Sequence, residues 1–240
     1  LEFRRVLFRS RTVGSIKAPW AEKYGRCSFM SEKSYPVITI ARQYGSGGRE
    51  IGQRLAELLG IKSYDRELIT MAAQKSGMST EVLHHVDEKA TNSLLYTLAL
   101  GSSYYGAASV GMDVPINDKL FITQSQIIRD LATEGPCIII GRCSDYVLRS
   151  NPARFSIFVY APLEARIKHV IERGAASTEK EARDLISRTD KRRINYYNYY
   201  TGRKWGNPDN YNMLIDSSFL GIEGTVKAIA DVYREKREAF

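Results

Sequence analysis

One segment, residues 37–60, constrains the fold of this chain more than any other: VITIARQYGSGGREIGQRLAELLG. Its first five residues form an apolar run typical of a buried strand, and its later apolar residues recur at helical spacing until Gly60. The glycine-rich turn between them lets the backbone curl so that successive N–H groups point inward. Together with the positive end of the following helix, such a turn is suited to bind phosphates. A plain glycine-rich connection is the alternative.

Short apolar runs and helical patterns alternate along the rest of the chain. We expect further strands at 61–64, 137–140, 155–160 and 213–215. Helices are expected at 65–77, from Ser79 onward, from Asn117 or Asp118 through Leu131, and after Pro162. A further helix is expected to begin at a capping box of Thr178 and Glu181, and the last one at 222–233. Residues 101–117 are expected to form a glycine-rich connection. This alternation favours an α/β fold, in which a mostly parallel sheet has helices on both faces and binds ligands at its carboxyl edge.

The net charge of +8, from 35 lysines and arginines against 27 acidic residues, would ordinarily favour a nucleic-acid or membrane partner. The position of the charge argues otherwise, because residues 1–33 hold eight basic and three acidic side chains and contribute +5. The remaining 207 residues carry only +3. The most apolar long window, 94–112, is interrupted by glycines and polar residues and is a poor membrane span. We therefore expect neither a membrane nor a nucleic acid as partner.

Residues 1–34 show no sustained periodicity, and their opening, LEFRRVLFRSR, reads like translated cloning sequence. We expect this segment to be a disordered or non-native leader, followed by one domain at 35–240. Three cysteines are too few for a disulfide framework or a zinc site. A cytoplasmic location is therefore the simplest expectation.

Six motifs carry a family resemblance: ITIARQYGSGGREIG (38–52), YDRELI (64–69), CIIIGRCSDYVL (137–148), FVYAPLEARI (158–167), DKRRINYYNYYTGRKWG (190–206) and NYNMLIDSS (210–218). Together they resemble the cytidylate kinase-like family of P-loop proteins over essentially all of residues 36–236. The resemblance implies a P-loop NTPase three-layer sandwich, with a five-stranded parallel sheet in the order 2-3-1-4-5, a helical lid and NMP-binding insertions.

The same resemblance implies an activity, in which the γ-phosphate of ATP is transferred to a pyrimidine monophosphate. CMP or dCMP is the favoured acceptor, so the partners are small nucleotides. Mg²⁺ would bridge the donor phosphates with few direct protein ligands, and the sequence assigns none.

The loop departs from the family's pattern, G-P-S-G-A-G-K-G-T. This pattern aligns with residues 42–50, so that two glycines coincide while the lysine falls on Gly48 and the threonine on Glu50. The resemblance assigns the donor phosphates to Gly45, Ser46, Gly47, Gly48, Arg49 and Glu50. Arg49 is the expected catalytic cation in place of the lysine, and Arg42 is the alternative, although guanidinium binds as a planar fork.

Other positions match the acceptor site and the lid. Asp65 and Arg142 fall where the family binds the acceptor, and Asp145 lies close enough to replace acids missing from the family's D-G-R-D. Asp190 and Arg193 resemble the D-x-x-R of the lid, which is expected at 174–204. With Arg188 and Arg192, Arg193 is expected to act in catalysis, because phosphoryl transfer depends on alignment and charge neutralisation. A solvated basic helix face is the alternative.

Aromatic residues crowd the end of this region: Tyr196, Tyr197, Tyr199, Tyr200, Trp205 and Tyr211. Stacking on a base or on single-stranded RNA is one interpretation, and packing of the lid helix against the domain or a dimer mate is the favoured one. A homodimer therefore stays open. The functional alternatives to a CMP kinase are an ATP-binding regulatory protein without turnover, a kinase for another small phosphate acceptor, and an RNA-binding module.

Overall fold

The computed structural model describes residues 35–65, 67–76 and 116–237 of the chain. The expectations for the leader at 1–34, the helix from Ser79 and most of the connection at 101–117 lie outside these residues. Among the described helices, none has the length and apolar character needed to cross a membrane.

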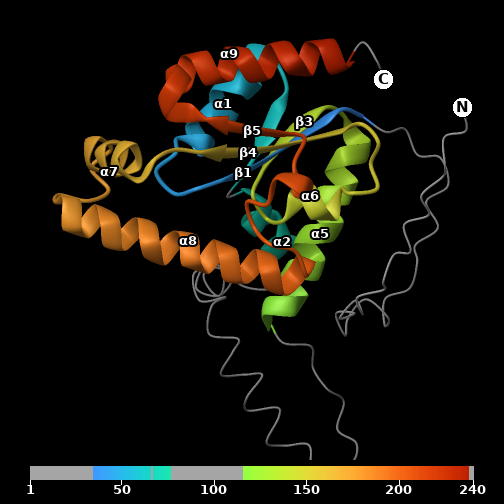
Figure 1. Ribbon diagram of the computed structural model, residues 1–240. Helices are drawn as coiled ribbons and strands as arrows, with labels where there is room; N and C mark the ends of the chain where they lie inside the picture. Colours follow the sequence, from blue (N-terminus) through green and yellow to red (C-terminus); the bar gives the residue numbers. More distant parts are fainter. Residues whose placement is uncertain (1–34, 66, 77–115, 238–240) are drawn as a thin grey trace, which may run out of the picture. The chain divides into compact units, whose positions relative to one another are not determined.

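The described strands form one parallel sheet in the order β2-β3-β1-β4-β5, which confirms the expected topology (Figure 1). The strands are β1 (Val37–Arg42), β2 (Lys62–Tyr64), β3 (Cys137–Ile140), β4 (Arg154–Tyr160) and β5 (Met213–Asp216). In the centre, Ile38 of β1 lies opposite Ile138 of β3 and Phe155 of β4. The carboxyl ends of the strands therefore lie at one edge, where the loop after β1 begins.

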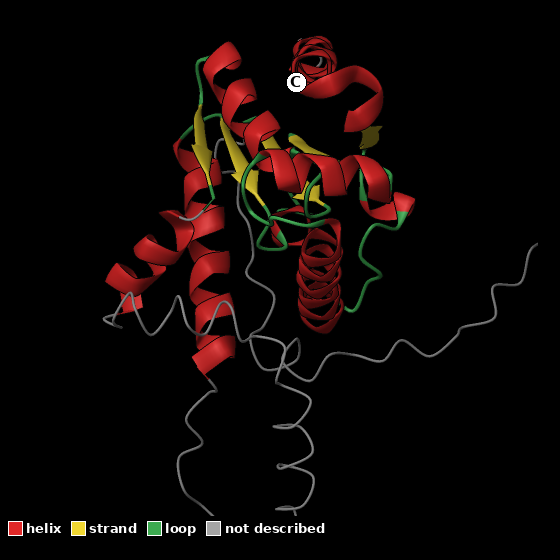
Figure 2. Ribbon diagram, turned by 90° about the vertical axis from the view of Figure 1, so that its left-hand side faces the viewer, coloured by secondary structure: helices red, strands yellow, loops and turns green. Residues whose placement is uncertain are grey.

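Helices cover both faces of the sheet, so the fold is a three-layer sandwich (Figure 2). They are α1 (Gly48–Leu59), α2 (Glu67–Ser76), α5 (Ile116–Glu134), α6 (Ser144–Val147), α7 (Leu163–Glu172), α8 (Glu179–Thr201) and α9 (Ser217–Arg237), with a 3-10 turn, η2, at Pro208–Asn210. α1 and α9 pack on one face, and α2, α5 and α6 pack on the other.

The core explains why the strands are continuous apolar runs. On β1, Ile38 and Ile40 face α1 and α9, whereas Val37 faces α5, and all three are fully buried. On β3, Ile138 and Ile139 face opposite layers in the same way. Because both faces of the sheet are covered, alternation between polar and apolar residues is lost.

Several helix ends follow the sequence signals. Gly60 ends α1 in the left-handed conformation (φ 65°), and Thr178 Oγ1 accepts a hydrogen bond from the N–H of Glu181 at 3.2 Å. The Glu181 carboxylate accepts from the N–H of Ser177, one residue before the cap. The last helix begins at Ser217 rather than 222 and is interrupted by Gly221 (φ 67°, ψ 176°).

The loop after β1 touches α7 directly, and this contact requires a glycine. Gly45 has φ 82°, and a Cβ there would lie 2.9 Å from the carbonyl oxygen and 3.0 Å from the Cβ of Arg166. The carbonyl oxygen of Arg166 belongs to the backbone of α7 and cannot rotate out of the way. Contact with α7 therefore fixes the shape of the loop.

We therefore expect Gly45→Ala to destabilise the protein by about 2–4 kcal/mol, from the left-handed backbone and the overpacking combined. Urea denaturation of the full chain measures the change. Gly135→Ala is the matched control, because a Cβ at 135 meets nothing within 4 Å. A Gly45→Ala variant as stable as this control would contradict the contact with α7.

Candidate active site

Hydroxyl groups of two serines fix the loop between β1 and α1 on its buried side. The Ser46 Oγ lies 2.9 Å from the carbonyl oxygen of Gln43 and 3.2 Å from that of Val159. Ser217 Oγ donates to the carbonyl oxygen of Ser46 at 2.7 Å. The buried Ser46 side chain therefore shapes the loop from inside the protein, and any contact of Ser46 with a ligand would come from its backbone.

The amino-terminal end of α1 has no side-chain cap among the described residues. Gly47 precedes the helix in the left-handed conformation (φ 73°). Intrahelical bonding begins with the N–H of Ile51, which donates to the carbonyl oxygen of Gly47. The N–H groups of the first turn therefore have no intrahelical acceptor, and with the helix dipole they are suited to bind an anion.

Four arginines lie close together beside this helix end, and two of them pair with one buried carboxylate. We call the four the arginine cluster: Arg42, Arg49, Arg142 and Arg193. Asp65, directly after β2, has Oδ1 3.3 Å from Arg42 Nη2 and Oδ2 3.0 Å from Arg49 Nε. The expected donor-site and acceptor-site residues Arg49 and Asp65 thus meet in one ion pair.

The four positive charges of the cluster outnumber the two carboxylates that pair with them, Asp65 and Asp190, which lies 3.9 Å from Arg193. Burial, followed by repulsion from Arg193, lowers the pKa of Arg42 to about 9, and Arg142 and Arg49 act in the same direction. Burial likewise lowers the pKa of Arg193. Arginine stays protonated at neutral pH, so the excess charge favours an anionic ligand with several negative charges.

An unusual turn after β3 places Arg142. Gly141, Arg142 and Cys143 have φ values of 78°, 57° and 53° in succession. Two of these residues carry side chains, and each costs of order 1–2 kcal/mol in the left-handed region. Strain of this kind gathers at functional sites, where surrounding structure holds a side chain in a required direction.

Asp145, expected near the acceptor, is buried and bonded within the protein. The Tyr197 hydroxyl donates to its Oδ2 at 2.6 Å, and burial raises the pKa of the Asp145 carboxyl. Its role in binding the acceptor stays a prediction.

The predicted lid helix α8 is docked on the loop. Asp190 Oδ1 accepts from the N–H of Tyr44 at 2.7 Å, and its Oδ2 accepts from Arg166 Nη1 at 2.6 Å. One turn later, Arg193 Nη1 donates to the carbonyl oxygen of Arg42 at 2.8 Å. The two residues expected from the lid motif are therefore brought together with the loop.

The other two lid arginines lie outside these contacts. Arg188 and Arg192 are exposed on α8, and Arg188 Nε donates to the carbonyl oxygen of Asp184 in its own helix at 3.4 Å. Glu50, at the threonine position of the loop, pairs with Arg54 at 2.7 Å.

Tyrosines anchor the second half of α8 to the domain. Tyr197 and Tyr200 are buried, the Tyr200 ring stacks on Phe121 of α5 at 4.1 Å, and its hydroxyl donates to Asp118 at 2.9 Å. Packing of the lid helix against the domain is thus confirmed for these two rings. Tyr199 remains exposed.

Sequence reasoning missed two residues of the site, Tyr44 and Arg166. Arg166 lies in the FVYAPLEARI motif, but the motif was interpreted only as a strand and a helix. Its partner Asp190 is 24 residues away on another helix, so no local spacing joins them.

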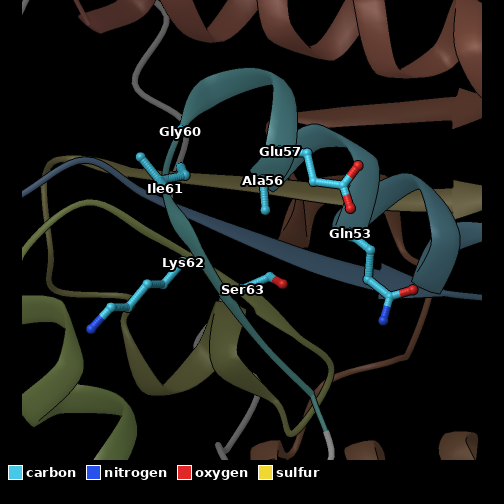
Figure 3. A pocket seen from close by; sticks show the side chains of 7 residues that line it. All are labelled: Gln53, Ala56, Glu57, Gly60, Ile61, Lys62 and Ser63. Carbon is cyan, nitrogen blue, oxygen red and sulfur yellow. The ribbon is translucent and has the colours of Figure 1, made fainter.

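A separate cavity of about 700 Å³ lies at the edge of the sheet, beside β2 (Figure 3). Its lining comes from the second half of α1 and the start of β2: Gln53, Ala56, Glu57, Gly60, Ile61, Lys62 and Ser63. It contains no residue of the arginine cluster, and Lys62 is its one cation. The cavity therefore lacks the charge that distinguishes the loop.

Comparison with known proteins agrees with this geometry. The cytidylate kinase of Methanopyrus kandleri is 28% identical over 214 residues, covering 84% of this chain and 96% of that protein. The cytidylate kinase of Staphylothermus marinus is 24% identical over 196 residues, covering 81% and 94%. An uncharacterized protein from Eubacterium ventriosum has a similar crystal structure, with a TM-score of 0.57, 25% identity, and coverage of 85% of this chain and 99% of that one.

The family comparison covers nearly the whole described domain and confirms the expected resemblance to P-loop phosphotransferases. Because residues 37–219 match the sequence profile of the cytidylate kinase-like family, the chain belongs to that family.

Proposed function

We infer that this protein transfers the γ-phosphate of ATP to a nucleoside monophosphate, and that CMP or dCMP is the acceptor. The observation that carries the proposal is the arginine cluster beside Asp65, which lies at the uncapped amino-terminal end of α1 and next to the docked helix α8. Family membership and the cytidylate kinases among its relatives support the choice of acceptor.

The donor phosphates would lie on the loop. The first-turn N–H groups of Gly48, Arg49 and Glu50 point to the same place as the positive end of the α1 dipole. Gly45 and Ser46 act by holding the loop in the curled shape that presents these groups.

Mg²⁺ fits this site as an ion bound mainly by phosphate oxygens and water. Among the described residues, no group of three or more His, Cys, Asp or Glu side chains could hold a metal ion. Glu50 is paired with Arg54, and the Ser46 hydroxyl points inward, so the loop offers few protein ligands. When bound, the ion neutralises charge on the donor phosphates.

The chain's own residues would align the reactants and neutralise charge during transfer. Arg142, aimed by the strained turn after β3, would hold the acceptor phosphate, and Asp65 would fix the guanidinium groups beside it. Arg193 is held at the loop by the docked helix α8, which would therefore supply a cation and exclude water together. Arg188 and Arg192 would join only if α8 moved further toward the loop.

In a coupled assay of ADP release with the full chain, we expect CMP or dCMP to be used at least about tenfold faster than UMP or AMP, because the site must read the base edge. Reactions without acceptor give the background. Tight ATP binding without transfer to any acceptor would instead favour the non-catalytic regulatory protein, and salt-sensitive RNA binding without ATP affinity would favour the RNA-binding module.

Arg193→Gln should lower kcat by roughly 100-fold, because it removes the cation of the arginine cluster that comes from α8 and contacts the loop backbone. Lys191→Gln is the control, since Lys191 is an exposed cation two residues away on the same helix. Equal rates for the two variants would remove Arg193 from the mechanism.

A further inference from the structure

The space beside Gly48 is already filled. Gly48 occupies the position of the lysine in the loop pattern, and a Cβ there would lie 2.6 Å from the Cβ and 3.0 Å from the Cγ of Arg42. These atoms belong to the rigid base of the Arg42 side chain, which cannot swing away without moving β1. A lysine at 48 and the arginine at 42 therefore exclude each other.

A second glycine makes room for the other end of the same side chain. A Cβ on Gly141, in the turn after β3, would overlap the Nη1 of Arg42. Arg42 therefore runs between the first turn of α1 and the turn after β3. The contact with Gly48 is the one that excludes a larger residue, because Nη1 is the mobile end of the arginine and the left-handed backbone of Gly141 (φ 78°) favours glycine by itself.

The two residues have exchanged roles relative to the loop pattern. The pattern begins with a glycine and places the lysine six residues later, whereas this chain has Arg42 at the first position and Gly48 at the later one. We propose that Arg42 supplies, from the end of β1, the cation that a P-loop lysine supplies from the first turn of the helix, and that its guanidinium contacts the terminal phosphates of the donor. This inference rests on the proposed function.

Arg49 does not fill that position. It follows Gly48 by one residue, so its side chain leaves α1 about 100° further around the helix. Its side chain is 34% exposed, against 18% for Arg42, and it reaches Asp65 through Nε. Arg49 therefore reaches Asp65 from the solvent-exposed side, whereas Arg42 lies against the first turn of α1.

The contacts of Arg42 hold its guanidinium in place and leave it able to bind phosphate. Nη2 pairs with Asp65 at 3.3 Å, which fixes one side of a group that has five N–H donors. The carbonyl oxygen of Arg42 accepts from Arg193, so α8 fixes the backbone of the same residue. The neighbouring Arg49, Arg142 and Arg193 raise the local positive charge, which a bound phosphate would relieve.

ATP binding by the full chain tests this assignment without depending on transfer. Arg42→Gln should weaken ATP binding, measured by calorimetry, by at least about tenfold and more than Arg49→Gln does, because a charged hydrogen bond to phosphate is lost. The melting temperature of each variant shows whether it is folded. Arg42→Gln that is folded and binds ATP within threefold of the unchanged protein would overturn the proposal.

A matched pair of double variants separates the effect of a positive charge at position 48 from the effect of a long side chain there. Arg42→Gly with Gly48→Lys restores the order of the loop pattern, and Arg42→Gly with Gly48→Gln places an uncharged side chain of similar length there. We expect the lysine variant to bind ATP at least about tenfold more tightly than the glutamine variant, and to recover transfer to CMP. Equal affinities in this pair would overturn the proposal even if Arg42→Gln does not fold.

The result also distinguishes this inference from the proposed function. If the unchanged protein binds ATP, loses affinity on Arg42→Gln, and transfers phosphate to no acceptor, the role of Arg42 is supported and the kinase activity is contradicted. If the unchanged protein has no affinity for ATP, both are overturned.

Discussion

The structure depends on keeping four guanidinium groups close together with only two carboxylates, Asp65 and Asp190, paired with them. Mutual repulsion and burial both oppose this arrangement, as the lowered pKa of Arg42 shows. Only a rigid scaffold maintains it, and here β1, α1, the turn after β3 and α8 each deliver one arginine from a different direction. Charge that is fixed before a ligand arrives requires little reorganisation when phosphate binds, which is how preorganised sites stabilise transferring phosphoryl groups.

The glycines of the loop serve packing as well as ligand binding. Gly45 is pressed against α7, and a Cβ on Gly47 would overlap the Cδ1 of Ile222 on α9. Gly48 lies against Arg42. The two interpretations of the turn, as a phosphate site and as a tight connection, are therefore compatible, because the curl that exposes N–H groups at the start of α1 is the one that lets the neighbouring helices approach.

The sequence predicted what depends on local signals. Buried strands appear as apolar runs, and Gly60 and Thr178 mark helix ends. It missed α6, which is only four residues long, and the early start of α9, where Asp216 Oδ1 accepts from the N–H of Ser218 before the interruption at Gly221.

The part of the site that the sequence did not predict depends on contacts between distant residues. Asp145 bonds to Tyr197, 52 residues later, and Arg42 lies against Gly48 and Gly141 only once the sheet has formed. Motif alignment compares one position at a time, so it offers Arg42 only as an alternative to Arg49 and does not show which glycines lie against it. The contacts of α8 with the loop also join residues that are far apart in the sequence, because Asp190 and Arg193 bind backbone groups of Tyr44 and Arg42. Because these contacts are made to backbone groups, they depend on the shape of the loop rather than on the identity of its side chains.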